Sequence, residues 1–359
     1  MKKNQIIAVC LLIFGLVGIG IYKWLGNLTE KVFVSPVASL RAATAAAALR
    51  NQGNVNLISE RFSTQSPVNF LLLGYGGATH DGTYLTDSIM VLNLNPKTSK
   101  ATLISIPRDI WVGNKKINSF YSQHIKEGPA VAGRAAMDAV SQVTGLNMDR
   151  FVSVSFDGFT KTIDALGGVD VKVDVTFDDY QYPIEGKEDD LCGKDPAELP
   201  AITATASATK NPELIFPCRY KHLHFDAGTV HMDGITALEF VRSRHSAQDG
   251  SDFGRSRRQK NLLVAVKQKV MSVNFITSAL PFINRLGDEV RTDLSLDEAR
   301  VLISTAGKLA DYKISSLAIT DENYLISSQS TDGQYVLIPK AGADNWTEVH
   351  TWIENQTKE

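Results

Sequence analysis

Cysteine is scarce in this sequence of 359 residues, which contains only three. One of them, Cys10, lies in an apolar run near the N-terminus, and we interpret it as an apolar filler. The other two, Cys192 and Cys218, are much farther apart than the C-x-x-C spacing that is usual in a cytosolic metal-binding pair. They bracket a stretch rich in proline, alanine and threonine, and an isolated pair that closes such a loop is typical of an oxidising compartment. The sequence therefore predicts a Cys192–Cys218 disulfide in a domain outside the cytoplasm.

A strong excess of charge is also absent, because 37 lysines and arginines face 39 acidic residues and give a formal net charge of -2. Without a basic surface field, general binding to nucleic acid is not expected. The sequence also has no internal repeat. Most of its length follows the N-terminal segment and is enough for one large domain with a sizeable core.

The N-terminal segment carries no charge between Lys3 and Lys23, and no small-x-small cleavage site follows closely. The length of this run is close to the ~20 residues that a membrane-spanning helix needs. We therefore expect a cytoplasmic tail over residues 1–4, a transmembrane helix over residues 5–24 and a tether over residues 25–67. Lysines on the two sides of the span nearly balance, so the expected orientation rests mainly on the cysteine pair.

Runs typical of strands and helices alternate through residues 68–359. The expected strands cover residues 68–73, 88–94, 101–106, 169–175 and 335–338, and the expected helices cover residues 134–143, 159–166, 346–353 and a long stretch after residue 252. Residues 181–218 show little periodicity and indicate an insertion loop. The alternation predicts an α/β domain with a central mixed β-sheet flanked by helices.

Five arginines fall within residues 240–259, which is unusual for a chain of near-neutral charge. We expect a strand that turns into a helix, with Arg242 and Arg244 on one face of the strand. On the helix, Arg255, Arg258 and Gln259 would share one polar face, because residues three and four apart are neighbours. Arginine forks match phosphate oxygens, and a helix N-terminus adds N–H donors. This stretch therefore predicts a site for a phosphate or pyrophosphate.

Acidic residues accompany a glycine-rich loop at residues 74–82. Asp81 and Asp87 would offer the hard oxygen ligands that Mg²⁺ prefers, although aspartate and glycine are also common in turns. Arg108 and Asp109 follow the third expected strand and would place a guanidinium at a cleft, or form a simple loop ion pair.

Two histidines, His222 and His224, share one face of an expected strand. No third ligand lies nearby in the sequence, and such a pair is more often a polar surface feature than a metal site.

Nine short motifs occur in a fixed order along the chain. They are NFLLLG (69–74), LTDSIM (85–90), SIPRD (105–109), KIN (116–118), FDGF (156–159), DALGGVD (164–170), MDGITAL (232–238), VRSR (241–244) and R-x-x-RQ (255–259). Together they resemble the LytR-CpsA-Psr family over residues 68–270, and so many ordered motifs do not arise by chance.

The resemblance implies a membrane-anchored enzyme with an extracytoplasmic catalytic domain. Members of this family move glycopolymers such as teichoic acid or capsule from a polyprenyl-pyrophosphate carrier to peptidoglycan, with Mg²⁺ or Mn²⁺. Residue by residue, it implies a metal-associated acid at Asp87, an adjacent polar residue at Gln259, and pyrophosphate-binding arginines at Arg108, Arg242, Arg244, Arg255 and Arg258.

Two positions depart from the family pattern. Gly76 stands where the family often has aspartate, and Leu85 stands where it often has arginine. Asp81 then becomes the candidate for the first metal-binding carboxylate. Asp109 or Asp252 would assist deprotonation of an acceptor hydroxyl, and the sequence does not choose between them.

Two other functions stay open at this point. A polyprenyl-pyrophosphate hydrolase would use the same site, with water in place of the acceptor. An envelope-anchored regulator would bind lipid or glycan without catalysis.

Overall fold

The computed structural model describes residues 57–77, 83–198, 213, 215–250, 252–270, 290–295, 297–298, 301–302, 305 and 312–358. The expected tail, transmembrane helix and most of the tether lie outside these residues, and so does Asp81. Within the described ranges, no helix combines the length and the apolar character that crossing a bilayer requires.

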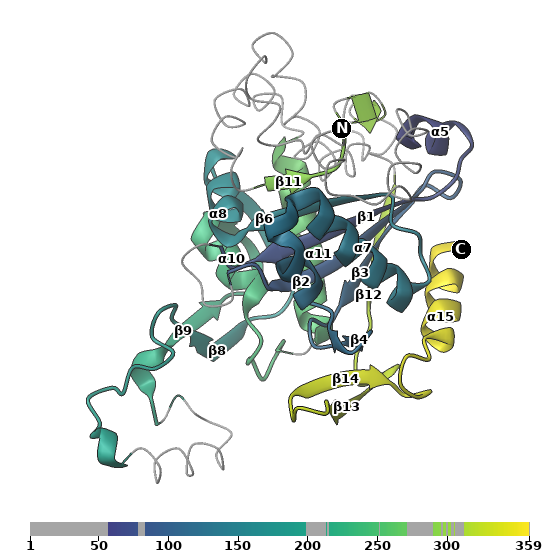
Figure 1. Ribbon diagram of the computed structural model, residues 1–359. Coiled ribbons are helices and arrows are strands. Elements are labelled where there is room, and N and C mark those ends of the chain that lie inside the picture. Colours follow the sequence, from purple (N-terminus) through teal and green to yellow (C-terminus); the bar gives the residue numbers. More distant parts are fainter. Residues whose placement is uncertain are drawn as a thin grey trace.

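A six-stranded mixed sheet forms the centre of the domain (Figure 1). Its strand order is β11 (Val290–Thr292), β6 (Arg150–Ser155), β1 (Val68–Tyr75), β2 (Thr86–Asn95), β3 (Lys100–Ile106) and β12 (Lys313–Ala318). Strand β1 runs antiparallel to β2 and parallel to β6, and β3 runs antiparallel to β2 and parallel to β12. The predicted α/β class with a central mixed sheet is confirmed.

Helices cover both faces of this sheet, because its inner strands are apolar on both sides. Leu71 and Leu73 of β1 pack in a cluster with α6 (Ser119–His124), α7 (Pro129–Thr144) and α15 (Thr347–Lys358). Phe70 and Leu72 point to the opposite face, where the clusters include residues of α8 (Phe156–Ala165), α10 (Gly234–Arg242) and α11 (Asp252–Val270). This second face carries the candidate site.

Smaller elements surround this core. They are α5 (Leu57–Ser63), the hairpin β4 (Trp111–Val112) and β5 (Lys115–Lys116), the pair β7 (Val169–Val173) and β10 (Gly228–Met232), the pair β8 (Phe177–Pro183) and β9 (Tyr220–Phe225), the hairpin β13 (Leu325–Gln329) and β14 (Tyr335–Pro339), and short 3-10 helices at Ile125–Glu127, Pro196–Glu198 and Pro217–Arg219.

The expected insertion loop connects β8 to β9, and this pair of strands projects from the body of the domain (Figure 1). Its first residues continue strand β8 as far as Pro183, so regular structure extends slightly beyond the predicted start of the loop. Cys192 and Cys218 form the predicted disulfide, with an S–S distance of 2.02 Å.

Helix ends near the site follow local sequence signals. Ser155 begins α8 and accepts a hydrogen bond from the Gly158 amide at 3.0 Å, and Asp233 caps α10 by accepting from the Thr236 amide at 2.8 Å. Gly234 lets α10 approach α8 closely, because a Cβ at this position would lie 2.2 Å from the carbonyl oxygen of Thr160.

The predicted strand at residues 240–244 is wrong. Helix α10 continues through Arg242, and Ser243 ends it with an extended ψ of 137°. The buried positions Gly234, Ala237 and Phe240 repeat every three residues, which is a helical spacing that the sequence already contained.

Candidate functional site

One side of the site is formed where β2 begins and β3 ends. Asp87 is the second residue of β2, and Arg108 follows β3 by two residues. The Arg108 guanidinium pairs with the Asp87 carboxylate, and its Nε lies 3.6 Å from Asp109 Oδ2. Burial alone would lower the pKa of Arg108, but attraction to Asp87 and Asp109 outweighs it and raises the pKa. Arg108 therefore stays cationic, and its side chain remains 40% exposed to a ligand.

The other side is a corner between α10 and α11. Arg242 is the last residue of α10, and its guanidinium carbon lies 4.1 Å from the centre of the Phe156 ring. Tyr182 of β8 flanks the same guanidinium, at 5.8 Å. Arg244 follows in the loop after α10. The two arginines thus reach one pocket from a helix end and a loop, rather than from one face of a strand.

A buried aspartate that sequence reasoning missed fixes this loop. Asp179 of β8 accepts hydrogen bonds from Ser243 Oγ at 2.6 Å and from the backbone amides of Arg244 and His245 at 3.0 and 3.1 Å. Burial would raise the pKa of Asp179, but these hydrogen bonds, with one from the Gln181 amide, lower it. No local motif marks Asp179, because the partners that it holds in the loop after α10 lie more than sixty residues away in the sequence.

Arg258, predicted to bind pyrophosphate, is only 2% exposed and does not line the pocket that contains the other arginines. Its Nε donates to the carbonyl oxygen of Phe240 at 2.9 Å, and its Nη1 pairs with Asp249 Oδ2 at 2.8 Å. Nη2 donates to the carbonyl oxygen of Ser243. Burial lowers the pKa of Arg258, although Asp249 opposes the shift. The geometry gives Arg258 a structural role, since it ties the loop after α10 to α11.

Arg257 pairs with Asp249 and lies 3.8 Å from Asp174. Its side chain is still 42% exposed.

The two sides enclose a cavity of about 220 Å³, here called the arginine pocket. Six predicted site residues line it: Asp87, Arg108, Arg242, Arg244, Arg255 and Gln259. Gln259 Oε1 is buried and has no hydrogen-bond partner among the described residues, so this acceptor is left unsatisfied in a residue that lines the cavity. Four arginines with few acids around one cavity form a site for a doubly charged anion such as pyrophosphate.

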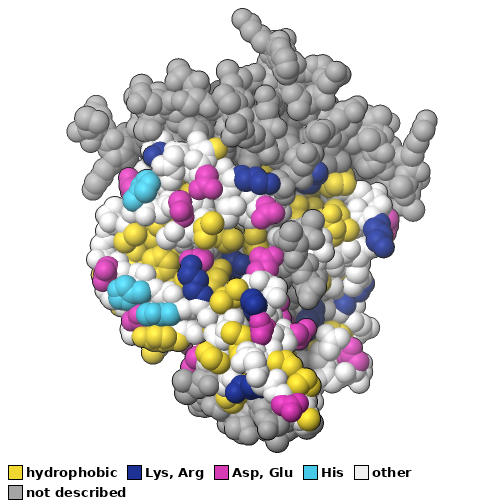
Figure 2. Space-filling view, turned by 90° about the vertical axis from the view of Figure 1, so that its left-hand side faces the viewer, with side chains coloured by type: hydrophobic (Ala, Val, Ile, Leu, Met, Phe, Trp, Pro, Cys, Tyr) yellow, Lys and Arg dark blue, Asp and Glu magenta, His cyan; other side chains and the backbone are white. Residues whose placement is uncertain are grey.

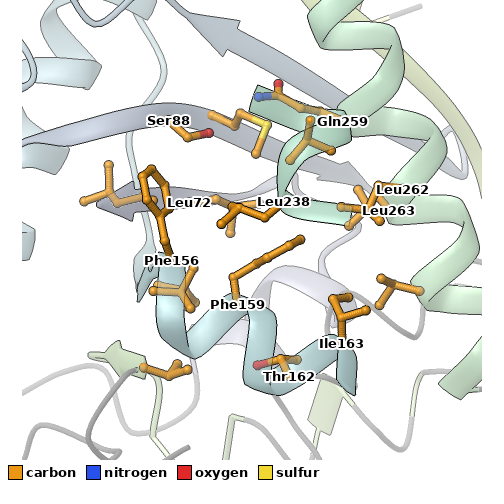
Figure 3. Close-up of a pocket in the computed structure, with 18 residues that line it drawn as sticks. Leu72, Ser88, Phe156, Phe159, Thr162, Ile163, Leu238, Gln259, Leu262 and Leu263 are labelled. Atoms are coloured by element: carbon orange, nitrogen blue, oxygen red, sulfur yellow. The ribbon is translucent and has the colours of Figure 1, made fainter. Parts of the chain in front are cut away.

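An apolar pocket of about 200 Å³ adjoins the arginine pocket, and the two share Ser88, Phe156, Val241 and Gln259. Figure 3 shows Leu72 from the sheet, Phe159 from α8, Leu238 from α10 and Leu262 from α11 pointing into it. A dry apolar cavity of ~150 Å³ already accepts a small hydrocarbon. The apolar pocket therefore fits the first part of a hydrocarbon chain whose charged end lies among the arginines.

A polar cleft of about 530 Å³ adjoins the arginine pocket through Asp87 and Arg108. Asp109 lines this cleft, and its Oδ1 accepts from Lys116 Nζ at 2.8 Å. Asp109 therefore lies beside the arginine pocket. Asp252, the other candidate base, begins α11, and its side chain lies outside the described part of the structure.

The residues that would hold a divalent cation are only partly described. Asp87 and the Ser88 hydroxyl offer hard oxygen donors in the arginine pocket, which suits Mg²⁺, and Asp81 lies outside the described residues. Within the described ranges, the only trio of potential ligands close enough to share a metal is Asp190, Cys192 and Cys218, and both cysteines are used in the disulfide.

His222 and His224 both hydrogen-bond Asp178 Oδ1, each at 2.8 Å. The pair is thus a polar surface feature in this structure, as the sequence indicated.

The face with α8, α10 and the β8–β9 pair is seen in Figure 2. Near its middle, basic and acidic side chains lie next to one another, and hydrophobic side chains border them. This face thus carries charged and hydrophobic side chains side by side.

Known proteins with similar sequences include two curated relatives. One is the polyisoprenyl-teichoic acid–peptidoglycan teichoic acid transferase TagU of Oceanobacillus iheyensis, 29% identical over 69% of this chain and 65% of that protein. The other is TagV of Bacillus subtilis, of the same named activity, 26% identical over 74% of this chain and 60% of that protein. The chain thus matches less than two thirds of the length of either relative.

Solved structures share the fold. The crystal structure of B. subtilis TagV has a TM-score of 0.53 and 24% identity, and the match covers 82% of this chain and 98% of that one. A protein from Streptococcus agalactiae has a TM-score of 0.55 and 20% identity, with 84% and 91% covered. A profile of the LytR_cpsA_psr family matches residues 34–349, which is most of the sequence. The chain therefore belongs to the LytR_cpsA_psr family.

Proposed function

We propose that this protein is a membrane-anchored phosphotransferase that moves a glycopolymer from a polyprenyl-pyrophosphate carrier to cell-wall peptidoglycan. The observation that carries the proposal is the junction of two unlike pockets. The arginine pocket suits a pyrophosphate and the apolar pocket suits a hydrocarbon chain, and they share four lining residues. A lipid pyrophosphate is the ligand that has both parts. The names of the curated relatives, which are teichoic acid transferases, support the same substrate class.

The reaction would be an in-line displacement at phosphorus. An acceptor hydroxyl of peptidoglycan attacks the phosphorus that carries the polymer, and a new P–O bond forms. The P–O bond to the polyprenyl phosphate breaks, and this phosphate leaves with the electron pair. Negative charge grows on the non-bridging oxygens, and the fixed guanidinium groups of Arg108, Arg242 and Arg244 would stabilise it.

A divalent cation, Mg²⁺ or Mn²⁺, would be held by Asp87 and by Asp81. When bound, it supplies positive charge to the pyrophosphate oxygens. Asp87 also accepts from Arg108, so the same carboxylate would orient the arginine.

A base must accept the proton of the attacking hydroxyl, and it must lie where the acceptor enters the site. Asp109 is favoured over Asp252 because Asp109 lines the polar cleft next to Arg108. Its contacts to Lys116 and Arg108 hold the carboxylate in a fixed direction.

Residues 5–24 would anchor the protein in the membrane, with the described domain on the extracytoplasmic side. The Cys192–Cys218 disulfide supports this side, because disulfides persist mainly in oxidising compartments.

The test is to incubate the purified full chain with a polyprenyl-pyrophosphate-linked glycopolymer and peptidoglycan, and to analyse the products with and without the acceptor. We expect polymer joined covalently to peptidoglycan and an equal amount of polyprenyl phosphate. Release of free polymer at the same rate in both reactions would instead indicate a hydrolase. Attachment that survives in a folded Arg242→Ala protein would contradict a catalytic role and favour a binding regulator.

A further inference from the structure

We infer that the polar cleft beside Arg108 is the binding site for the acceptor glycan, and that Trp111 is the surface against which a sugar ring stacks. The inference rests on the proposed function for the identity of the acceptor, and it assigns the acceptor to a place and to named residues.

The order of the three cavities along strand β2 and Leu85, the residue just before it, gives the first argument. Met90 lines the apolar pocket, Ser88 lines both the apolar pocket and the arginine pocket, Asp87 lines the arginine pocket and the polar cleft, and Leu85 lines the polar cleft. The apolar pocket and the polar cleft share no lining residue. The polar cleft therefore lies beyond the arginine pocket from the side that would hold the lipid.

The geometry of in-line displacement shows which cavity would hold the acceptor. The attacking and the leaving oxygens stand on roughly opposite sides of the phosphorus. The leaving group is the polyprenyl phosphate, whose tail would occupy the apolar pocket. The attacking hydroxyl must then approach from the opposite side, which is where the polar cleft meets Asp87 and Arg108.

The side chains of the cleft suit a glycan rather than a second lipid. Trp111 of β4 is half-buried and lines the cleft beside Lys116, its partner in the β4–β5 hairpin. A flat indole face packs well against the apolar face of a pyranose ring, and its N–H remains available to a polar group. Of the two lysines in the cleft, Lys116 is paired with Asp109, and Lys115 would attract a carboxylate of a muropeptide.

Amide groups provide the polar half of this recognition. Asn118 is the N-cap residue of α6, yet its side chain makes no capping hydrogen bond. The Asn118 side chain, which does not serve as a cap, lines the cleft. Gln123 and Gln334 line it too, but Gln123 already accepts from Lys115 Nζ at 2.7 Å and donates to Ser119 Oγ at 2.9 Å, and Gln334 Nε2 donates to Asp332 at 2.6 Å. Such groups both donate and accept, as recognition of sugar hydroxyls and N-acetyl groups requires.

The experiment uses the full chain in detergent and measures binding of soluble, uncrosslinked peptidoglycan glycan fragments by calorimetry. Trp111→Ala should weaken binding by about tenfold, because the stacking surface is lost. Trp111→Phe should retain most of the affinity, since it keeps a flat ring. Tyr180→Ala is the matched control, because Tyr180 is an exposed aromatic residue on β8 that lines none of the three cavities. Unchanged affinity of the folded Trp111→Ala protein would overturn the inference.

A second titration separates the acceptor from the sugars of the donor. With a non-reactive polyprenyl-pyrophosphate glycoside present at saturation, the glycan fragment should still bind, because the two ligands would occupy adjoining sites. Displacement of the fragment would assign the cleft to the donor and overturn the inference. Glycan binding without any transfer activity would contradict the proposed function alone and leave the glycan site in place.

Discussion

The two sides of the arginine pocket are built differently. At the strand ends, Asp87 and Arg108 pair through their side chains, and both remain partly exposed. At the helix corner, the backbone that carries Arg244 is held from beneath by Asp179 and Arg258, which are buried. One side therefore places its charges with direct ion pairs, and the other places them by fixing a loop.

The difference shows that arginines close in sequence or space can have different roles, one in ligand binding and another in stabilising the fold. Arg108 lines a pocket and contacts solvent, so its loss should affect the ligand more than the fold. Arg258 lies under the loop, so its loss should affect the fold first.

The largest expected effect on stability follows from Arg258→Met, which removes the buried support of the helix corner. The change removes the buried partner of the Asp249 carboxylate, which keeps only the more exposed Arg257, and it removes the donors to the carbonyl oxygens of Phe240 and Ser243. Breaking such a buried pair costs about 3–5 kcal/mol of stability. Denaturant unfolding should show this loss, and Arg258→Lys should recover only part of it because a lysine lacks the fork. A fully stable Arg258→Met protein would contradict the structural role.

Asp87→Ala addresses the strand-end side. We expect loss of the divalent-dependent activity, because the site would lose one of its hard oxygen ligands and Arg108 would lose its partner. Asp81→Ala should only raise the metal concentration that is needed. Titrating Mg²⁺ against activity separates the two variants, and an Asp87→Ala enzyme with unchanged metal dependence would remove this residue from the site.

Arg108→Lys should lower turnover by about 100-fold and leave the melting temperature unchanged, since the charge stays and the bidentate fork is lost. The metal requirement should not move. Parallel measurements of turnover, metal titration and thermal unfolding check this set of outcomes. A large loss of stability would contradict the conclusion that Arg108, unlike Arg258, acts mainly on the ligand.

The different roles of Arg108 and Arg258 could not be predicted from the sequence, although much of the fold around them could. The apolar runs predicted strands β1, β2 and β3 correctly, and the predicted helix over residues 134–143 is part of α7, which Gly145 ends with a left-handed φ of 73°. The burial of Arg258 depends on carbonyl oxygens that a loop presents, and a residue pattern does not encode their direction.

The site itself was only half predictable. Six of the predicted residues line the arginine pocket, because motifs at strand and helix ends keep their order in space. Asp179 and Asp249 were missed, since each acts on residues brought close only by the fold. The alternation of V-R-S-R resembled a strand, although the three-residue spacing of buried positions continued α10 through Arg242.

Asp179→Asn tests the buried support of the helix corner, and we expect an effect of intermediate size on stability. At neutral pH we expect a loss of about 1–3 kcal/mol of stability, because the carboxylate that accepts from Ser243 and two amides is replaced. The pKa of Asp179 is lowered in the folded state, so its contribution is present above the unfolded pKa of ~3.9 and is lost as pH falls through the folded value. The difference from the wild type should therefore shrink in acid. A constant difference across a series of unfolding curves at decreasing pH would contradict this reasoning.

The smallest effect is expected from Arg257→Ala, the matched control for Arg258. Arg257 also pairs with Asp249, but its side chain is 42% exposed against 2% for Arg258, and Asp249 keeps Arg258 as a partner. Exposed pairs contribute ~0–1 kcal/mol, so stability and turnover should stay close to those of the wild type. A loss as large as that of Arg258→Met would mean that burial does not separate the two neighbours.

The most direct test of the account is a crystal structure of the chain with a non-reactive polyprenyl-pyrophosphate glycoside. We predict the isoprenoid chain between the sheet and α8, α10 and α11, and the pyrophosphate in contact with Arg108, Arg242, Arg244 and Arg255. Arg258 should keep its buried contacts to Asp249. A pyrophosphate bound away from these four arginines, or a lipid chain outside the apolar pocket, would contradict the central claim that the two adjoining pockets hold one ligand.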